Sequence, residues 1–206
     1  MRSTPRRARR SPRSADSAVS GGQVERIPLD RLPLTDRVVT LRQLAIADAA
    51  AIATACRDPE IPRWTFMPEG LTVPQARAWI ETAHDALQRG RSLRLAITDA
   101  ADGAFLGQVG IGDLDWTQQV GEVFYWVAAP ARGRGVATRA AKLLTAWAFE
   151  VLNLARIEIT VDPRNNGSQR VALAAGYTRE GILRSYQRFK DGRMDAVMFS
   201  RLPADP

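Results

Sequence analysis

The stretch from Gly121 to Val151 constrains the fold most strongly, because it joins a strand to a helix through a basic glycine turn. Its first part is a run of β-forming residues, VFYWV, which stops at Pro130, whose missing N–H cannot continue a strand ladder. From Val136 onward, apolar residues recur with the i, i+3, i+4 spacing of a helix that buries one face. We therefore predict a strand that ends before Pro130 and a helix that begins just after Gly135.

The connection between this strand and this helix has the sequence RGRGVA. Its two glycines leave backbone N–H groups unshielded by side chains, and the positive end of the helix dipole adds to them. With the arginines they form a site for a phosphate or pyrophosphate, although the segment also fits an ordinary structural connection. The spacing matches neither GxxxxGK[ST] nor the three-glycine GxGxxG pattern. The predicted anion site consists of Arg132, Gly133, Arg134, Gly135, Val136 and Ala137.

A second segment, DPRNNGS, follows an alternating strand pattern over residues 156–161 and opens a short apolar helix that Gly176 and Tyr177 end. An Asn and a Ser before a helix are also routine caps, so this segment alone favours a structural role. The order of the two segments is more informative than either one. Few folds combine a phosphate loop that opens one helix, a strand, and an N-x-x-S motif that opens the next helix.

Together, the two segments resemble the GNAT acetyltransferases. The opening TDRVVTLR at residues 35–42 and the Arg-Trp-Thr loop at residues 63–65 resemble most closely the RimJ/RimL-like ribosomal-protein N-terminal branch. In that family the loop [Q/R]-x-x-G-x-[G/A] binds the pyrophosphate of acetyl-CoA, and N-x-x-S precedes a helix that ends in G-[FY]. The resemblance covers residues 36–203. The matching residues are Arg132, Gly135 and Ala137 in the loop, and Asn165 and Ser168 in the second motif.

The resemblance implies an α/β (α+β) fold with a mixed, mostly antiparallel central sheet of six to seven strands and helices on both faces. The chain's own pattern agrees, since strand and helix alternate in the middle while hairpins flank them. With 206 residues, 45% of them hydrophobic, we expect one domain over residues 23–206. Residues 59–70 contain three prolines, so we predict an irregular loop whose aromatic cluster packs into the core or lines a cleft.

The reaction implied by the resemblance is direct transfer of acetyl from acetyl-CoA to a primary amine, without a metal. Glu122 occupies the position of the glutamate base of the histone-acetylating members, in the similar setting Glu-[VI]-x-[FY]; alternatively, it is an exposed charge at a strand end. Ser168 either donates to the leaving thiolate or holds the pantetheine arm. Many relatives instead use a tyrosine at the position of Ala172, and that mechanism is unavailable here.

Other residues are expected to contact the co-substrate. The resemblance places Asn165 and the backbone near Val127 against the pantetheine arm. Arg170 either reaches a phosphate or remains a solvated helix charge. The single histidine, His84, fits a surface or hydrogen-bonded residue better than a catalyst, and the single cysteine, Cys56, fits a small buried hydrophobe.

Residues 1–22 are predicted to form a disordered Arg-rich arm, because they contain almost no large apolar residue. Without the six arginines of this arm, 23 basic residues face 22 acidic ones, so the folded part is nearly neutral and its charge does not indicate nucleic-acid binding. The arm is either a solvated leader or a weak tether to ribosomal RNA.

No apolar run is long enough to span a membrane, and no secretory signal follows the arginines, so we expect a cytoplasmic protein. The most favoured acceptor is a protein N-terminus. A small-molecule amine such as an antibiotic or polyamine is an alternative, as is a non-catalytic module that binds the ribosome or RNA. The sequence leaves open whether the chain is a monomer or a homodimer.

Overall fold

Eight strands form one sheet in the computed structural model, which describes residues 26–190 and 192–206. Their order across the sheet is β1-β2-β3-β4-β5-β6-β8-β7, and every neighbouring pair is antiparallel except β5 with β6. The strands are β1 (Leu34–Thr35), β2 (Val39–Gln43), β3 (Leu93–Asp99), β4 (Phe105–Asp115), β5 (Val120–Val127), β6 (Arg156–Val161), β7 (Thr178–Phe189) and β8 (Gly192–Arg201). The predicted mixed sheet is confirmed, but its count is too low because the two-residue β1 was missed.

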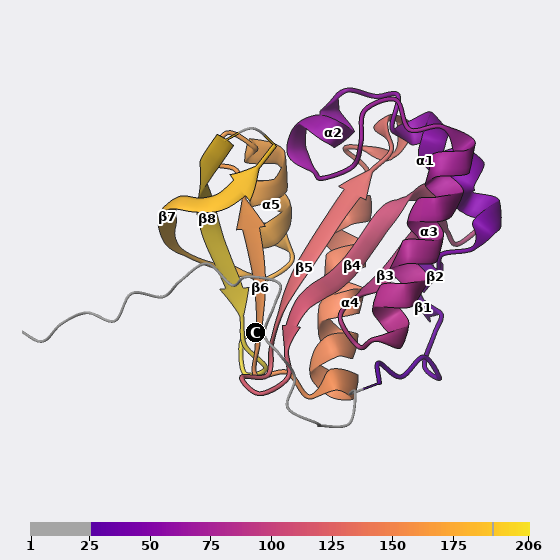
Figure 1. The fold of residues 1–206 in the computed structure, drawn as a ribbon. Helices are drawn as coiled ribbons and strands as arrows, with labels where there is room; N and C mark the ends of the chain where they lie inside the picture. Colours follow the sequence, from indigo (N-terminus) through magenta and orange to yellow (C-terminus); the bar gives the residue numbers. More distant parts are fainter. Residues whose placement is uncertain (1–25, 191) are drawn as a thin grey trace, which may run out of the picture.

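Helices cover both faces of this sheet, with α1 and α3 in front and α4 behind (Figure 1). The helical segments are η1 (Ile46–Asp48), α1 (Ala49–Ala55), α2 (Glu60–Trp64), α3 (Val73–Gln88), η2 (Ala129–Ala131), α4 (Val136–Leu152) and α5 (Asn166–Ala174). The side chain of Thr72 caps α3 and Gln75 completes a capping box, as a Thr before the helix predicts. The predicted helix after Gly135 is confirmed as α4.

The strand β5 contributes to two separate cores, because its successive side chains point to opposite faces of the sheet. Val123 packs with α4, where Leu144 and Trp147 are buried. Trp126 packs on the other face with α1 and α3, where Ile52 and Ile80 are fully buried. It follows that Glu122 and Phe124, which alternate with Val123, face the side of α1 and α3.

The expectation of an irregular loop over residues 59–70 is wrong in its first half, where the chain forms the short helix α2. Pro59 is the N-cap of α2, and Pro62 lies in its first turn. Prolines are tolerated at these positions, because the first N–H groups of a helix have no partner within the helix. The number of prolines in this segment therefore does not exclude a helix, because two of them stand at positions where a helix tolerates proline.

Candidate active site

A cleft opens where β5 and β6 diverge. The two strands pair in parallel only from Val120 to Glu122, opposite Arg156 to Glu158, and then separate (Figure 1). The cleft has a volume of about 1250 Å³ and is lined by α2, the middle strands, the start of α4, α5 and the tips of β7 and β8. Pockets for drug-sized ligands are usually smaller, at about 300–1,000 Å³. This cleft therefore has room for a long co-substrate and an acceptor together.

The glycine turn forms one end of the cleft. Gly133 and Gly135 have φ values of +73° and +75°, and no other atom lies within 4 Å of a β-carbon built at either position. Gly135 is the N-cap of α4, and no side chain caps the first amides of this 17-residue helix. These amides face the cleft through Val136 and Ala137, so the turn fits a phosphate group as the sequence predicts.

The two arginines of this turn already have protein partners. Arg132 forms an ion pair with Asp58 at 2.6 Å, and its Nε donates to the carbonyl oxygen of Val127 at 3.1 Å. Arg134 lies 3.4 Å from Asp99 at an exposed position. Because Arg132 is held in this way, the turn offers its backbone amides more directly than its arginine side chains.

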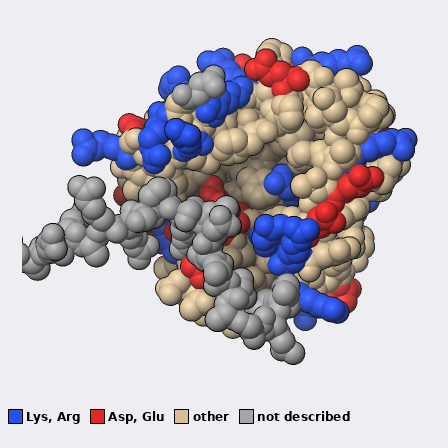
Figure 2. Space-filling model, viewed as in Figure 1, with Lys and Arg blue, Asp and Glu red and all other residues tan. Residues whose placement is uncertain are grey.

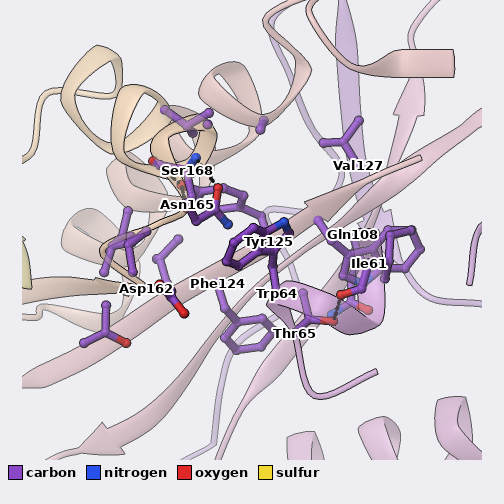
Figure 3. A pocket seen from close by; sticks show the side chains of 18 of the residues that line it. Ile61, Trp64, Thr65, Gln108, Phe124, Tyr125, Val127, Asp162, Asn165 and Ser168 are labelled. Atoms are coloured by element: carbon purple, nitrogen blue, oxygen red, sulfur yellow. Dashed lines mark hydrogen bonds between the residues drawn. The ribbon is translucent and has the colours of Figure 1, made fainter. Parts of the chain in front are cut away.

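The N-x-x-S motif is built as a helix cap whose serine faces the cleft. Asn165 accepts a hydrogen bond from the backbone N–H of Ser168 at 3.0 Å, so its capping role is confirmed. The hydroxyl of Tyr125 lies 3.0 Å from the Ser168 hydroxyl and 3.2 Å from the Ser168 carbonyl oxygen. Figure 3 shows Tyr125, Asn165 and Ser168 at one end of the cleft, and Ile61, Thr65 and Gln108 toward the other.

Tyr125 is a functional candidate that the sequence prediction missed. Burial raises its pKa to about 12, so the phenol remains protonated at neutral pH and can donate to Ser168. The VFYWV run was interpreted only as β-forming residues. The signal in the sequence was its position two residues before Val127, where the resemblance already places the pantetheine arm. In the structure, side chains on that face of β5 have no β6 neighbour to cover them.

Glu122 lies half-buried on β5, where it lines the cleft instead of extending into solvent. The hydroxyl of Thr160 on β6 donates a hydrogen bond to its carboxylate. Burial raises the pKa of Glu122 to about 7, the negative charges of Asp113 and Glu158 add to this effect, and the hydrogen bond from Thr160 opposes it. A carboxyl group with this pKa is well suited to accept a proton near neutral pH.

The other predicted residues are placed as follows. Val127 and the exposed Arg170 both line the cleft. Ala172 is fully buried, so no side chain reaches the cleft from the position of the tyrosine that many relatives use. His84 lies outside the cleft and bonds the carbonyl oxygen of Leu44 through Nε2 at 2.9 Å, and it is therefore a hydrogen-bonded structural residue as expected.

The aromatic cluster after α2 both packs into the core and lines the cleft. Met67 is buried in the core beneath α1 and α3, whereas Phe66 is 65% exposed. The ring of Phe66 packs edge-on against Phe189 near the tip of β7, with 5.0 Å between the ring centroids. Trp64 and Phe66 also line the cleft, so this contact joins its two walls.

An opened sheet beside an uncapped helix N-terminus has the shape and the donors to hold a long, phosphate-bearing co-substrate between two strands. A model of the acetyltransferase (GNAT) domain matches residues 39–178. The chain therefore belongs to the GNAT acetyltransferases, and it is an acetyl-CoA-dependent N-acetyltransferase.

Individual relatives agree with this family. An uncharacterized N-acetyltransferase of Bacillus licheniformis is 30% identical over 168 residues, which span 82% of this chain and 94% of that protein. Mycobacterium smegmatis RimJ, solved in complex with CoA-disulfide, is 28% identical with a TM-score of 0.74, covering 83% of this chain and 86% of that one. Escherichia coli K12 spermidine N(1)-acetyltransferase is 32% identical over only 82 residues, 40% of this chain and 44% of that protein.

Within residues 26–190 and 192–206, no group of three or more His, Cys, Asp or Glu side chains is arranged to hold a metal ion. The same residues contain no helix that is long and apolar enough to cross a bilayer.

Proposed function

We propose that this acetyltransferase acts on the α-amine of protein N-termini, with Glu122 as the general base and Ser168 assisting departure of the thiolate. The observation that carries this proposal is the position of Glu122. Its carboxyl group lies in the cleft and has a pKa of about 7. It accepts a hydrogen bond from Thr160 and is near the carboxylates of Asp113 and Glu158. An N-terminal ammonium has a pKa of about 7.7–8.0, so a base with this pKa is well matched to it.

The proposed reaction needs two proton transfers. Glu122 removes a proton from the acceptor ammonium, directly or through water, and the neutral amine attacks the thioester carbonyl carbon. A C–N bond forms as the C–S bond breaks, and the Ser168 hydroxyl donates a hydrogen bond to the sulfur that leaves. The attacking nitrogen then loses its second proton to this thiolate, so that an amide and free CoA result. Tyr125 supports this role, because its hydroxyl lies 3.0 Å from that of Ser168 and its proton is not lost at neutral pH.

The co-substrate is proposed to lie along the opened strands. The amides of residues 133–137 would bind its pyrophosphate, and Arg170 on the cleft wall would reach a further phosphate. The backbone of β5 up to Val127 and the side chain of Asn165 would hold the pantetheine arm. These groups are available because β6 has already separated from this part of β5.

The size of the cleft and the similarity to RimJ favour a protein acceptor. A polyamine or another small amine is the alternative, favoured by the similarity of 40% of the chain to a spermidine acetyltransferase. The Arg-rich residues 1–22 lie outside the described residues, and their contact with ribosomal RNA stays a prediction.

Acetyl transfer can be tested by incubating the full chain with acetyl-CoA and a panel of N-terminal peptides, polyamines and aminoglycosides. Release of free CoA would be followed by a thiol assay, and the acetylated product by mass spectrometry. We expect transfer to the α-amine of peptides. Turnover of polyamines or aminoglycosides alone would contradict the protein N-terminus as acceptor.

A further inference from the structure

Arg94 is a charged side chain in the cleft that the proposed reaction does not use. It lies on β3 opposite Gly110 of β4, and Gly110 lies opposite Phe124 of β5. These three positions share the face of the sheet that carries Glu122. Arg94 therefore belongs to the acceptor side of the cleft, apart from the glycine turn at the opposite end of β5.

Two aromatic rings hold the guanidinium of Arg94 in place. Its Cζ lies 5.1 Å from the ring centroid of Trp79 on α3 and 4.9 Å from that of Phe124. Gly110 makes this arrangement possible, because a β-carbon there would lie 2.5 Å from the ring of Phe124. Cation–π contacts fix the plane of the guanidinium but leave its N–H donors free to form other bonds.

Arg94 has no counter-ion among residues 26–190 and 192–206. No carboxylate lies within 4.0 Å of its guanidinium, and no hydrogen bond satisfies its N–H groups there. Arg63 and Arg164, which also line the cleft, are paired with Glu60 and Asp162. Burial lowers the pKa of Arg94, but an arginine remains charged at neutral pH. A half-buried, unpaired guanidinium on a cleft wall is suited to bind an anionic group.

The cleft therefore has two poles on its acceptor side. Glu122 and Asp113 supply negative charge at one pole, and Arg94 supplies positive charge at the other. In Figure 2, acidic and basic side chains border the same hollow. From the strand register, the α-carbons of Arg94 and Glu122 are two strands and two residues apart, or roughly 12 Å. An extended peptide covers about 3.3–3.6 Å per residue.

We infer that the acceptor is an N-terminus with an acidic side chain among its first three residues, which Arg94 binds while Glu122 faces the α-amine. This inference rests on the proposed function, because it places a peptide amine at Glu122. The α-carbons of the two residues are roughly 12 Å apart and both side chains line the cleft, so the carboxylate that Arg94 binds is placed at the second or third position of the peptide. A polyamine, which carries only positive charge, would place an ammonium against Arg94 and is disfavoured.

The test uses isomeric heptapeptides that differ only in where one Asp and one Asn stand. One has Asp second and Asn seventh, and the other has them exchanged, so composition and net charge are equal. Binding to the full chain saturated with CoA, which cannot react, would be measured by calorimetry, and turnover would be measured separately with acetyl-CoA. For the unaltered protein we expect about tenfold tighter binding of the peptide with Asp second, and a similar ratio in kcat/KM.

Three variants isolate the charge. Arg94→Met keeps an apolar stem between Trp79 and Phe124 but removes the guanidinium, and it should bind both peptides equally. Arg94→Lys should retain part of the preference, because a charge remains without the planar fork of donors. Arg89→Met removes the same charge from an exposed position outside the cleft and should retain the full preference.

The outcomes separate the two proposals. Equal binding of the isomers to the unaltered protein, or an undiminished preference in Arg94→Met, would overturn the role of Arg94 even if both peptides are acetylated. If the preference in binding depends on Arg94 but no peptide is acetylated, the anion site stands and the proposed acceptor fails. Tighter binding of spermidine than of either peptide would overturn both.

Discussion

The most demanding test of the proposed mechanism is Glu122→Gln, which keeps the shape of the side chain and removes its ability to accept a proton. Thr160 can still donate to the amide oxygen, so the packing between β5 and β6 should persist. Losing a general base lowers the rate by about 10²- to 10⁴-fold. Binding of CoA should be unchanged, because the glycine turn lies at the other end of β5.

The pH dependence follows from the raised pKa of Glu122. With a pKa of about 7, the carboxylate is ionised in roughly one tenth of the molecules at pH 6 and in roughly nine tenths at pH 8. The rate of the unaltered enzyme should therefore rise about tenfold over this range on account of the base. Glu122→Gln should lack this rise in rate. Its rate relative to the unaltered enzyme should recover at high pH, where more of the acceptor amine is already neutral.

As pH rises, the stability of the protein should fall while its activity increases. The pKa is raised from a usual 4.5 to about 7, so the folded state binds this proton more tightly than the unfolded state. The free energy of unfolding consequently falls as pH rises from about 4.5 to 7 and levels off above that. Glu122→Gln lacks this loss, so at pH 8 it should be more stable by at most about 3 kcal/mol, with no gain from this source at pH 4.

Rates would be measured from pH 5.5 to 9 under conditions in which acetyl transfer limits turnover, and unfolding by urea at pH 4 and 8. Glu158→Gln is the matched control, because it removes a neighbouring carboxylate that lines no part of the cleft. Glu158→Gln should keep the activity, and its rate should rise with pH at a lower pH than in the unaltered enzyme, since Glu158 helps to raise the pKa of Glu122. Near-normal turnover of Glu122→Gln at neutral pH would refute Glu122 as the base.

Three further outcomes test the rest of the site. Gly135→Val should weaken CoA binding in calorimetry, whereas Gly103→Val, at an equally open turn with the same φ of +75° away from the cleft, should not. Ser168→Ala should lower the rate by a factor that does not shrink at high pH, and the rate should still rise with pH around 7. Tyr125→Phe should have the same effect more weakly, because Asn165 still holds the backbone of Ser168. Deleting residues 1–22 should leave peptide turnover intact in a steady-state assay and weaken only a salt-sensitive association with ribosomes in sedimentation.

The features predicted correctly from sequence are those encoded within one short segment. The start of α4 follows from two glycines before an apolar helical period, and the cap of α5 follows from Asn165 three residues before Ser168. The edge strand β1 has only two residues, too few to show an alternation, and α2 is a single turn among prolines. Neither carries enough periodicity to be recognised.

The contacts that give the site its chemistry join segments far apart in the chain. Thr160 reaches Glu122 across 38 positions, and Tyr125 reaches Ser168 across 43. Each of these side chains has an ordinary local explanation as a strand residue, and only the pairing of the strands brings them together. The raised pKa of Glu122 was likewise hidden, because it depends on burial and on two carboxylates from neighbouring segments.

The alternation of β5 separates the two groups to which we assign the chemistry of the reaction. Glu122 faces the acceptor side with Phe124, and Tyr125 reaches α5 through the gap that β6 leaves. The proposed base and the proposed hydrogen-bond donor to the sulfur therefore lie on opposite faces of one strand, in different surroundings. With Glu122 as the proposed base, we expect the acceptor to approach from the side of α1 and α3. Arg94 lies on the same face of the sheet as Glu122, so the charge that we propose to select the peptide is on the side from which the amine would reach the proposed base.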